Sequence, residues 1–253
     1  MKARSANALT YYGLTDTGKA RTHNEDRWLA DLGSGLFVVA DGMGGQAAGA
    51  LAAGIVVETL PRLLHQRIEA STNLAAPESC APLWESLSEL SGRLRRESQG
   101  QMGLSGMGTT VVAVLIRGRQ ALIGHMGDSR AYLLRNEKLE RLTRDHTVTQ
   151  LLLEHGEITT SEALEHPAHG QLTRYVGMEG EALPEVRFLE LLPEDRLLLC
   201  TDGLSGMLSD ENLIAHLNRR SAPEEVCRNL IAASNEAGGK DNITALVIDV
   251  LDR

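Results

Sequence analysis

The chain has 253 residues, of which 42% are hydrophobic and 23% charged, as in ordinary globular proteins. Its 25 Lys and Arg against 34 Asp and Glu give a formal net charge of −9, which argues against a protein that mainly grips nucleic-acid phosphates. Two Phe, two Trp and four Tyr are too few to suggest a surface for stacking bases.

Cysteine usage and hydropathy indicate a cytoplasmic protein. Cys80, Cys200 and Cys227 are odd in number and form no Cys-x-x-Cys pair, which is typical of a reducing compartment without a disulfide framework. No apolar run approaches the roughly 18 residues of a membrane span, and the N-terminus lacks the apolar core of a signal peptide. We therefore expect no membrane insertion.

The N-terminal segment predicts one buried strand. Residues 1–12 read as a polar lead-in, and Trp28–Ala30 is a candidate start of a strand. The apolar run Leu36–Ala40 stops at Asp41, next to a glycine-rich stretch. A short apolar run bounded by glycines is typical of a buried strand.

Two helices are expected to follow this strand. Apolar residues at helical spacing predict the first over residues 47–68, and its many Gly and Ala residues predict close packing against a flat surface. Pro61 is expected to kink or split it. After a loop at 71–79, a second helix is predicted over 81–97.

The middle of the chain predicts an antiparallel meander. Four short strands separated by tight turns are expected over 111–116, 121–125, 131–134 and 138–142. Connections of a few residues can join antiparallel neighbours but not parallel ones. This pattern therefore argues against a doubly wound parallel sheet.

The C-terminal part predicts further helices and strands around a polar excursion at residues 157–185. A capping box at Ser221 and Glu224 is expected to open the last helix, and Ser209 to cap the one before it. The expected elements are a helix over 147–155, strands over 187–191, 196–200 and 243–250, and helices over 210–218 and 223–236. Strand groups with helix pairs indicate an α+β fold, with sheet on sheet and helices outside.

Carboxylates next to glycine stand at the ends of the predicted strands. They are Asp41, Asp128, Asp202 and Asp241, with Glu25 and Asp26 ahead of a further candidate strand. Each alone is well explained as a turn residue or helix cap. If the strand ends meet, however, the clustered charges need compensation, and an all-oxygen ligand set suits Mg²⁺ or Mn²⁺. A bridged pair of such ions supplies hydroxide for in-line displacement at phosphorus.

Other phosphate chemistries lack their motifs. None of the three cysteines is followed by Arg at the spacing that a cysteine-dependent phosphatase needs. The phosphate-binding loop Gly-x-x-x-x-Gly-Lys-[Ser/Thr] and the nucleophile motif Gly-x-Ser-x-Gly are both absent.

Seven short motifs follow one another along nearly the whole chain. They are Arg21–Asp26, Asp41–Gly45, Met107–Thr110, Gly127–Arg130, Asp145–Thr147, Thr201–Leu204 and Gly239–Thr244. Each alone is a weak signal. In this order they resemble the metal-dependent Ser/Thr protein phosphatases of the protein phosphatase 2C family, in their compact bacterial form.

The resemblance implies an αββα sandwich, in which two antiparallel β-sheets are flanked by helix pairs. It also implies that residues 1–253 form a single phosphatase catalytic domain, in which 157–185 is a small flap that selects substrates. The implied reaction is attack of a metal-bridging water or hydroxide on the phosphoryl group of phosphoserine or phosphothreonine.

The resemblance implies two tightly bound Mn²⁺ or Mg²⁺ ions and a weaker third. Asp41 would bridge the first two, with the Gly42 carbonyl on one of them. Asp202 and Asp241 would complete the ligands of the first ion. Asp128, together with Asp202, would hold the third.

Other residues of the motifs receive supporting roles from the resemblance. Glu25 and Asp26 would lie at the second ion, directly or through water. Arg21 would bind the substrate phosphate, the alternative being an exposed Arg in an ion pair. Thr109 and Thr110 are expected to orient the site rather than to bind metal.

The general acid that protonates the leaving alkoxide is left unassigned. Many relatives place a histidine within or just after the Asp-Gly motif, where this chain has Met43 and Gln46. His23, His146 and metal-bound water remain as candidates. His146, with Asp145, is otherwise expected to support the site or to close a strand.

Two alternative functions fit the sequence less well. A pseudo-enzyme that keeps only binding would lose at least one of Asp41, Asp202 and Asp241, and all three are present. A two-metal nuclease would need a basic track for its polyanion, which the net charge disfavours. The expected partners are therefore phosphorylated proteins and an antagonistic Ser/Thr kinase in a signalling pathway, with no nucleic acid, and the protein is expected to be a monomer.

Overall fold

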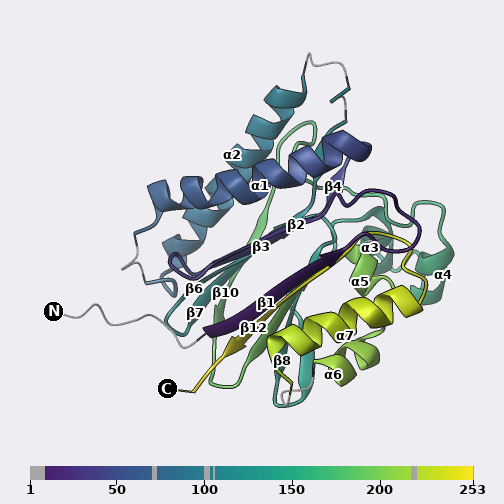
Figure 1. Cartoon of the computed structure of the whole chain (residues 1–253). Coiled ribbons are helices and arrows are strands. Elements are labelled where there is room, and N and C mark those ends of the chain that lie inside the picture. Colours follow the sequence, from purple (N-terminus) through teal and green to yellow (C-terminus); the bar gives the residue numbers. More distant parts are fainter. Residues whose placement is uncertain (1–8, 70–72, 100–102, 105, 218–220, 253) are drawn as a thin grey trace.

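Two antiparallel sheets packed face to face form the centre of the molecule (Figure 1). The computed structural model describes residues 9–69, 73–99, 103–104, 106–217 and 221–252. The strands of the first sheet, in spatial order, are β1 (Leu9–Asp16), β12 (Ile243–Val250), β11 (Arg196–Cys200), β8 (Arg130–Arg135) and β9 (Lys138–Arg141). Those of the second are β10 (Glu185–Glu190), β7 (Gln120–Met126), β6 (Val111–Arg117), β3 (Leu36–Ala40) and β2 (Arg27–Asp31). A separate two-stranded sheet pairs β4 (Gly42–Met43) with β5 (Gly108–Thr109).

Helices cover both outer faces of the sandwich (Figure 1). The second sheet is covered by α1 (Gln46–Arg67) and α2 (Cys80–Ser98), which follows a short 3₁₀ turn at Pro77–Ser79. The first sheet is covered by α5 (Asp202–Ser205), α6 (Asp210–His216) and α7 (Pro223–Glu236). The predicted αββα sandwich is thus confirmed.

The central strands are apolar on both faces because each face meets a different layer. In β3, Phe37 and Val39 point between the two sheets, whereas Leu36 and Val38 point toward α1 and α2. All of these residues are buried. This explains why the strand reads as one continuous apolar run rather than as an alternating one.

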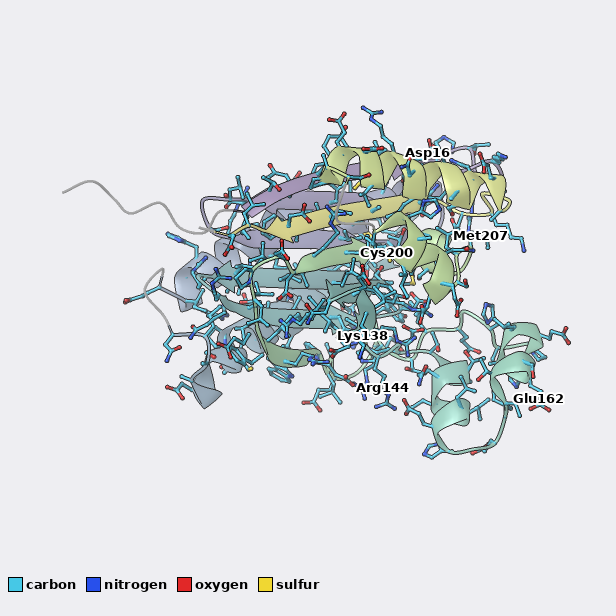
Figure 2. All side chains as sticks on the ribbon, turned by 90° about the horizontal axis from the view of Figure 1, so that it is seen from below. Asp16, Lys138, Arg144, Glu162, Cys200 and Met207 are labelled. Atoms are coloured by element: carbon cyan, nitrogen blue, oxygen red, sulfur yellow. The ribbon has the colours of Figure 1, made fainter. Side chains whose placement is uncertain are left out.

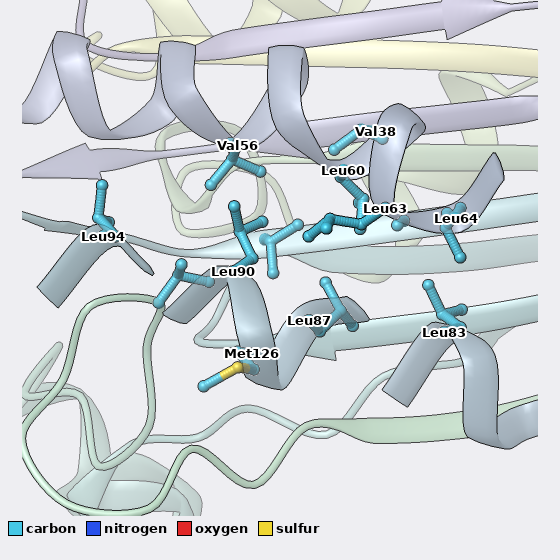
Figure 3. Packing of buried hydrophobic residues seen from close by; sticks show 14 of the residues in the cluster. Val38, Val56, Leu60, Leu63, Leu64, Leu83, Leu87, Leu90, Leu94 and Met126 are labelled. Carbon is cyan, nitrogen blue, oxygen red and sulfur yellow. The ribbon is translucent and has the colours of Figure 1, made fainter. Parts of the chain in front are cut away.

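The helix layer over the second sheet is a leucine-rich contact (Figure 3). Leu60 and Leu63 of α1 lie beside Leu87 and Leu90 of α2, and all four are fully buried. Of the two expected effects of Pro61, a split is wrong, because α1 runs unbroken from Gln46 to Arg67, whereas a kink stays a prediction. The leucines on both sides of the proline are buried, and this burial offsets the lost backbone hydrogen bond.

The expected polar lead-in of residues 1–12 is wrong from Leu9 onward, where β1 begins. This strand pairs antiparallel with β12 along its whole length and lies at the edge of the first sheet. An edge strand tolerates polar residues such as Thr10 and Asp16, and so it lacks the apolar run that marks a central strand.

The four strands between residues 111 and 142 form two hairpins in different sheets, not one meander. β6 and β7 pair in the second sheet, whereas β8 and β9 pair in the first. The chain crosses between the sheets at Gly127–Ser129, where Gly127 has a φ of 107°. Glycine adopts such a backbone angle without a steric penalty.

The N-termini of the last two long helices differ in their capping. Ser209 caps α6 as predicted, because its side chain accepts a hydrogen bond from the Asn212 N–H. The predicted capping box of α7 is wrong. That helix begins at Pro223, with Ala222 as its N-cap residue and no side-chain cap. Proline at the first helical position fixes a helical φ and needs no hydrogen-bond partner there.

The excursion between β9 and β10 carries α3 (Val148–Glu154) and α4 (Thr160–Glu165). Figure 2 shows the part around Glu162 standing to one side of the sheets. Thr147 caps α3, and a capping box between Thr159 and Glu162 opens α4. No helix among the described residues has the length and apolar character needed to cross a membrane.

Candidate metal centre

The predicted site residues meet in one cleft of about 500 Å³. Seven of the eight line it, and they come from segments spread over most of the chain: Arg21, Glu25, Asp41, Gly42, Asp128, Asp202 and Asp241. The eighth, Asp26, is fully buried next to them and raises the pKa of Asp41. Five carboxylates therefore line the cleft, and a sixth, Asp26, is buried beside them.

Strand ends of both sheets position these carboxylates. Asp41 lies between β3 and β4, and Asp128 lies in the turn between β7 and β8. Asp202 begins α5 directly after β11, and Asp241 precedes β12. Because the sheets pack face to face, the ends of these strands converge at one end of the sandwich, where Figure 1 shows β4 and α5.

Two threonines fix the backbone of Asp41. Its carbonyl oxygen accepts hydrogen bonds from the Thr109 hydroxyl at 2.8 Å and from the Thr110 N–H at 2.8 Å. The Asp41 N–H in turn donates to the Thr110 hydroxyl at 3.1 Å. These contacts agree with the expectation that both threonines orient the site.

Two glycines let α1 approach the site. A Cβ atom on Gly42 would clash with the carbonyl oxygen of Gly49, and one on Gly49 would clash with Glu25 Oε2. Gly42 and Gly49 therefore allow the start of α1 to lie directly against β4 and Glu25. This close approach explains why α1 has a glycine at position 49.

Two threonines hold Asp26. Both stand in the sequence motifs described above, but the sequence predicts no role for them. The Thr201 hydroxyl donates to Asp26 Oδ2 at 2.9 Å, and the Thr244 hydroxyl donates to the same oxygen at 2.6 Å. Asp26 Oδ1 is also buried but has no hydrogen-bond partner among the described residues. The only sequence signal for these threonines is their place beside Asp202 and Asp241.

Asn242 is a further residue that sequence reasoning missed. Its amide group donates to the carbonyl oxygens of Thr17 and His23, both at 2.9 Å, and accepts from the Glu25 N–H at 2.8 Å. It thereby holds the segment that carries Arg21 and Glu25 against the start of β12.

The carboxylates disfavour each other's ionisation. Burial, followed by the charges of Asp26, Asp202 and Asp128, raises the pKa of Asp41 well above its usual range. Burial and the charge of Asp202 raise the pKa of Asp128 to about 8. Burial also raises the pKa of Asp26 to about 7, although its threonine hydrogen bonds act in the other direction. Such a cluster stays ionised only when cations offset the charge.

The residues fit divalent metal ions. Two buried carboxylate oxygens, Asp26 Oδ1 and Asp202 Oδ1, have no hydrogen-bond partner among the described residues. Unpartnered buried oxygens are costly unless they bind a cation. The available ligands are all oxygen atoms, which suits Mg²⁺ or Mn²⁺ better than Zn²⁺.

Arg21 forms an ion pair within the cleft. Its guanidinium donates to Asp241 Oδ2 at 2.7 Å, while 55% of its side chain remains exposed. This is the ion pair considered as the alternative for Arg21. Because the pair lies at the cleft itself, a phosphate group entering there would meet the same guanidinium.

A second group of potential metal ligands lies apart from the cleft lining. Polar atoms of His125, His146 and Glu185 lie within 4.8 Å of one another. The two imidazole rings are stacked, with centroids 4.6 Å apart, so their lone pairs do not converge on one point. His146 Nδ1 accepts from the Gly127 N–H at 3.2 Å, and Glu185 pairs with Arg174 at 3.1 Å. We therefore interpret this group as a hydrogen-bonded network that joins the flap to the turn that carries Asp128.

The histidines considered as general acids do not line the cleft. His146 is buried, with its Nε2 atom 3.2 Å from Glu185, and His23 is exposed beside the Thr22 hydroxyl. Met43 does line the cleft. The side chain of Gln46 lies outside the described part of the chain.

Known proteins share both the sequence and the fold of this chain. The chain is 36% identical over 239 residues to the serine/threonine phosphatase Stp of Listeria monocytogenes, and the alignment covers 93% of each protein. The structure of PppA of Pseudomonas aeruginosa is 36% identical, with a TM-score of 0.83 over 97% of this chain and 100% of that one. The catalytic domain of PstP, described as a complex with two manganese ions, is also 36% identical, with a TM-score of 0.79 over 96% of this chain and 99% of that one. The sequence profile of protein phosphatase 2C matches residues 17–240, and the chain therefore belongs to the protein phosphatase 2C family.

Proposed function

We propose that this cleft hydrolyses phosphoserine and phosphothreonine in proteins, with Mn²⁺ or Mg²⁺ held by its carboxylates. The observation that carries the proposal is the convergence of five carboxylates in the lining of one cleft with a sixth, Asp26, buried beside them. Two of the six have a buried oxygen with no hydrogen-bond partner among the described residues. The relatives named as Ser/Thr phosphatases and the manganese ions of the PstP structure support it.

Asp41 is the proposed bridge between two ions, with the Gly42 carbonyl, Asp202 and Asp241 on the first. Glu25 and Asp26 would serve the second ion, directly or through water, and Asp128 with Asp202 a weaker third. When bound, such ions lower the pKa of water and offset the charge of the transferring phosphoryl group. The protein holds these oxygens in place, and the hydrogen bonds to the Asp41 backbone and to the Asp26 carboxylate support that role.

Arg21 is proposed to bind the phosphate of the substrate. A guanidinium pairs with phosphate through two parallel hydrogen bonds, which the ammonium group of lysine does not offer. Its half-exposed side chain, which pairs with Asp241 in the lining of the cleft, supports this role. Release of Asp241 toward a metal ion would leave the guanidinium available to the phosphate.

The whole chain is proposed to act as one catalytic domain, with residues 157–185 as its flap. We further propose that it works in the cytoplasm as a monomer, in a signalling pathway where it opposes a Ser/Thr kinase. The Ser/Thr phosphatase relatives and the net charge of −9 support a protein substrate rather than a nucleic acid.

Hydrolysis of a phosphothreonine peptide in the presence of Mn²⁺, Mg²⁺ or EDTA tests the proposal. We expect phosphate release with either metal, no release in EDTA, and recovery when excess Mn²⁺ is returned. Single-stranded DNA and RNA incubated with Mn²⁺ provide the test for a nuclease. Cleavage of nucleic acid without peptide dephosphorylation, or full peptide activity in EDTA, would refute the proposed function.

A further inference from the structure

Part of the cleft is apolar, beside the carboxylates and Arg21. Met43, Leu172 and Tyr175 line it together with the carboxylates, and each of the three is half-buried. Arg21 is the one cationic side chain of the described lining. The apolar side chains are not needed for metal or phosphate binding, which leaves them available for another part of a substrate.

The backbone adjacent to Tyr175 extends the small β4–β5 sheet. Val176 exchanges two hydrogen bonds with Thr109 of β5, one of 3.1 Å and one of 2.8 Å. On its other side β5 pairs with β4, so that Met43 lies directly opposite Gly108. The flap (157–185) is thus attached through Val176 to the same strand pair that follows Asp41.

Gly108 provides the space in which the Tyr175 ring lies. A Cβ atom on Gly108 would be 2.7 Å from Cδ2 of Tyr175, so the ring occupies the position where a side chain of Gly108 would project. Directly opposed residues of an antiparallel pair project to the same face. Met43 and Tyr175 therefore share one face of this strand pair, and both face the cleft.

The Tyr175 side chain is not committed to another contact through its polar end. Among the described residues its hydroxyl has no hydrogen-bond partner, although the ring is held over Gly108. A tyrosine held in this way offers a rigid apolar surface, because only two side-chain torsions must be ordered when a ligand binds. These properties suit a contact with a substrate rather than a structural role alone.

We propose that Met43 and Tyr175 form a subsite for an apolar side chain directly next to the phosphorylated residue of the substrate. This inference rests on the proposed phosphatase function. Consecutive Cα atoms are about 3.8 Å apart, so a neighbour of the phosphorylated residue must enter the same cleft. A leucine or phenylalanine there would bury apolar surface against the Tyr175 ring and Met43. An aspartate would find no free cationic side chain, because Arg21 is the one cationic side chain of the described lining and is proposed to bind the phosphate.

Matched phosphopeptides test the subsite. Three phosphothreonine peptides are compared, in which both residues next to the phosphothreonine are leucine, alanine or aspartate. N-acetyl-phosphothreonine amide serves as a substrate that has no neighbouring residues. At saturating Mn²⁺ we expect wild-type kcat/KM to be about tenfold higher for the leucine peptide than for the aspartate peptide, which corresponds to about 1.4 kcal/mol. Tyr175→Ala should reduce this ratio to about two, because it removes the apolar surface of the ring; each peptide is compared with the activity of the same variant on the amide. Tyr175→Phe should keep the preference.

The outcomes separate the subsite from the catalytic function. Equal wild-type kcat/KM for the three peptides would contradict the subsite and leave the phosphatase function intact, and this comparison needs no variant. A Tyr175→Ala protein that folds by circular dichroism but keeps the full preference would also contradict it. A roughly 100-fold loss in Tyr175→Phe on every substrate would assign the hydroxyl, not the ring, as the important group. Failure of the wild type on all substrates with Mn²⁺ would refute both proposals.

Discussion

The Thr244 hydroxyl donates a 2.6 Å hydrogen bond to Oδ2 of Asp26, a residue 218 positions earlier in the chain. Thr201 donates to the same oxygen at 2.9 Å, so this oxygen accepts two hydrogen bonds, while Oδ1 is buried with no hydrogen-bond partner in the described part of the chain. The threonines thus fix which oxygen of Asp26 remains available to a cation.

Thr244→Val removes one of these hydrogen bonds with little change in shape. We expect the Mn²⁺ concentration for half-maximal activity to rise about tenfold. Residues that orient a metal ligand by hydrogen bonding commonly change metal affinity by roughly 10- to 100-fold. Turnover at saturating Mn²⁺ should change by less than about threefold. Thr10→Val, on the exposed part of β1, is the matched control. An unchanged Mn²⁺ dependence would show that Asp26 does not contribute to metal binding through this contact.

Arg21→Ala should raise KM for a phosphothreonine peptide about tenfold, as expected for the loss of a hydrogen-bonded charge pair. Its effect on thermal stability should be small, because the pair with Asp241 is largely exposed. Arg228→Ala removes an exposed ion pair with Glu224 on α7, away from the cleft, and should leave KM unchanged. Steady-state kinetics with both variants decide the role of Arg21. If KM is the same as in the wild type, Arg21 is a surface ion-pairing residue only.

His146→Ala should reduce activity on a phosphothreonine peptide and on p-nitrophenyl phosphate by the same factor. His146 Nδ1 accepts from Gly127, so the ring proton is on Nε2, which faces Glu185 rather than the cleft. A general acid would instead be needed selectively for the alkoxide of the peptide. A loss about 100-fold larger on the peptide would identify His146 as that acid. His65→Ala, an exposed histidine on α1, controls for the loss of an imidazole.

Gly49 and Gly54 of α1 are predicted to respond in opposite ways to alanine. Gly49→Ala would push against Glu25 and Gly42, and we expect it to lower the free energy of unfolding by about 2 kcal/mol. Gly54 has open space around its Cα, so Gly54→Ala should raise that free energy by about 1 kcal/mol through helix propensity. Urea denaturation measures both. A Gly49→Ala protein as stable as wild type would mean that α1 does not press on the metal centre.

The sequence predicts the parts of the fold that depend on local patterns. Apolar runs identified β3 and β12 because these strands are buried on both faces. The edge strand β1 lacks such a run and was missed from Leu9 onward. Packing between distant segments decides which sheet a hairpin joins. The local sequence around Gly127 therefore does not predict that the chain changes sheets there.

The candidate site is also predictable only where it depends on local motifs. Its carboxylates carry a signal in their short motifs, of which those of Asp41, Asp128, Asp202 and Asp241 contain glycine, and the structure brings all of them together. The supporting contacts do not carry such a signal. The bonds of Thr201 and Thr244 to Asp26 join segments at opposite ends of the chain, and the Tyr175 ring lies over a glycine 67 positions earlier, so only the folded chain reveals them.

Mn²⁺ binding to the Asp41→Asn variant, measured by titration calorimetry beside phosphopeptide turnover, tests the central claim that Asp41 is the shared metal ligand. The control is Asp252→Asn, an exposed carboxylate away from the cleft. The wild type and the control should bind at least two ions per chain, whereas Asp41→Asn should bind Mn²⁺ at least about 100-fold more weakly and lose turnover by a similar or larger factor. An Asp41→Asn protein that binds Mn²⁺ and hydrolyses the peptide within about twofold of wild type would contradict the metal centre described above.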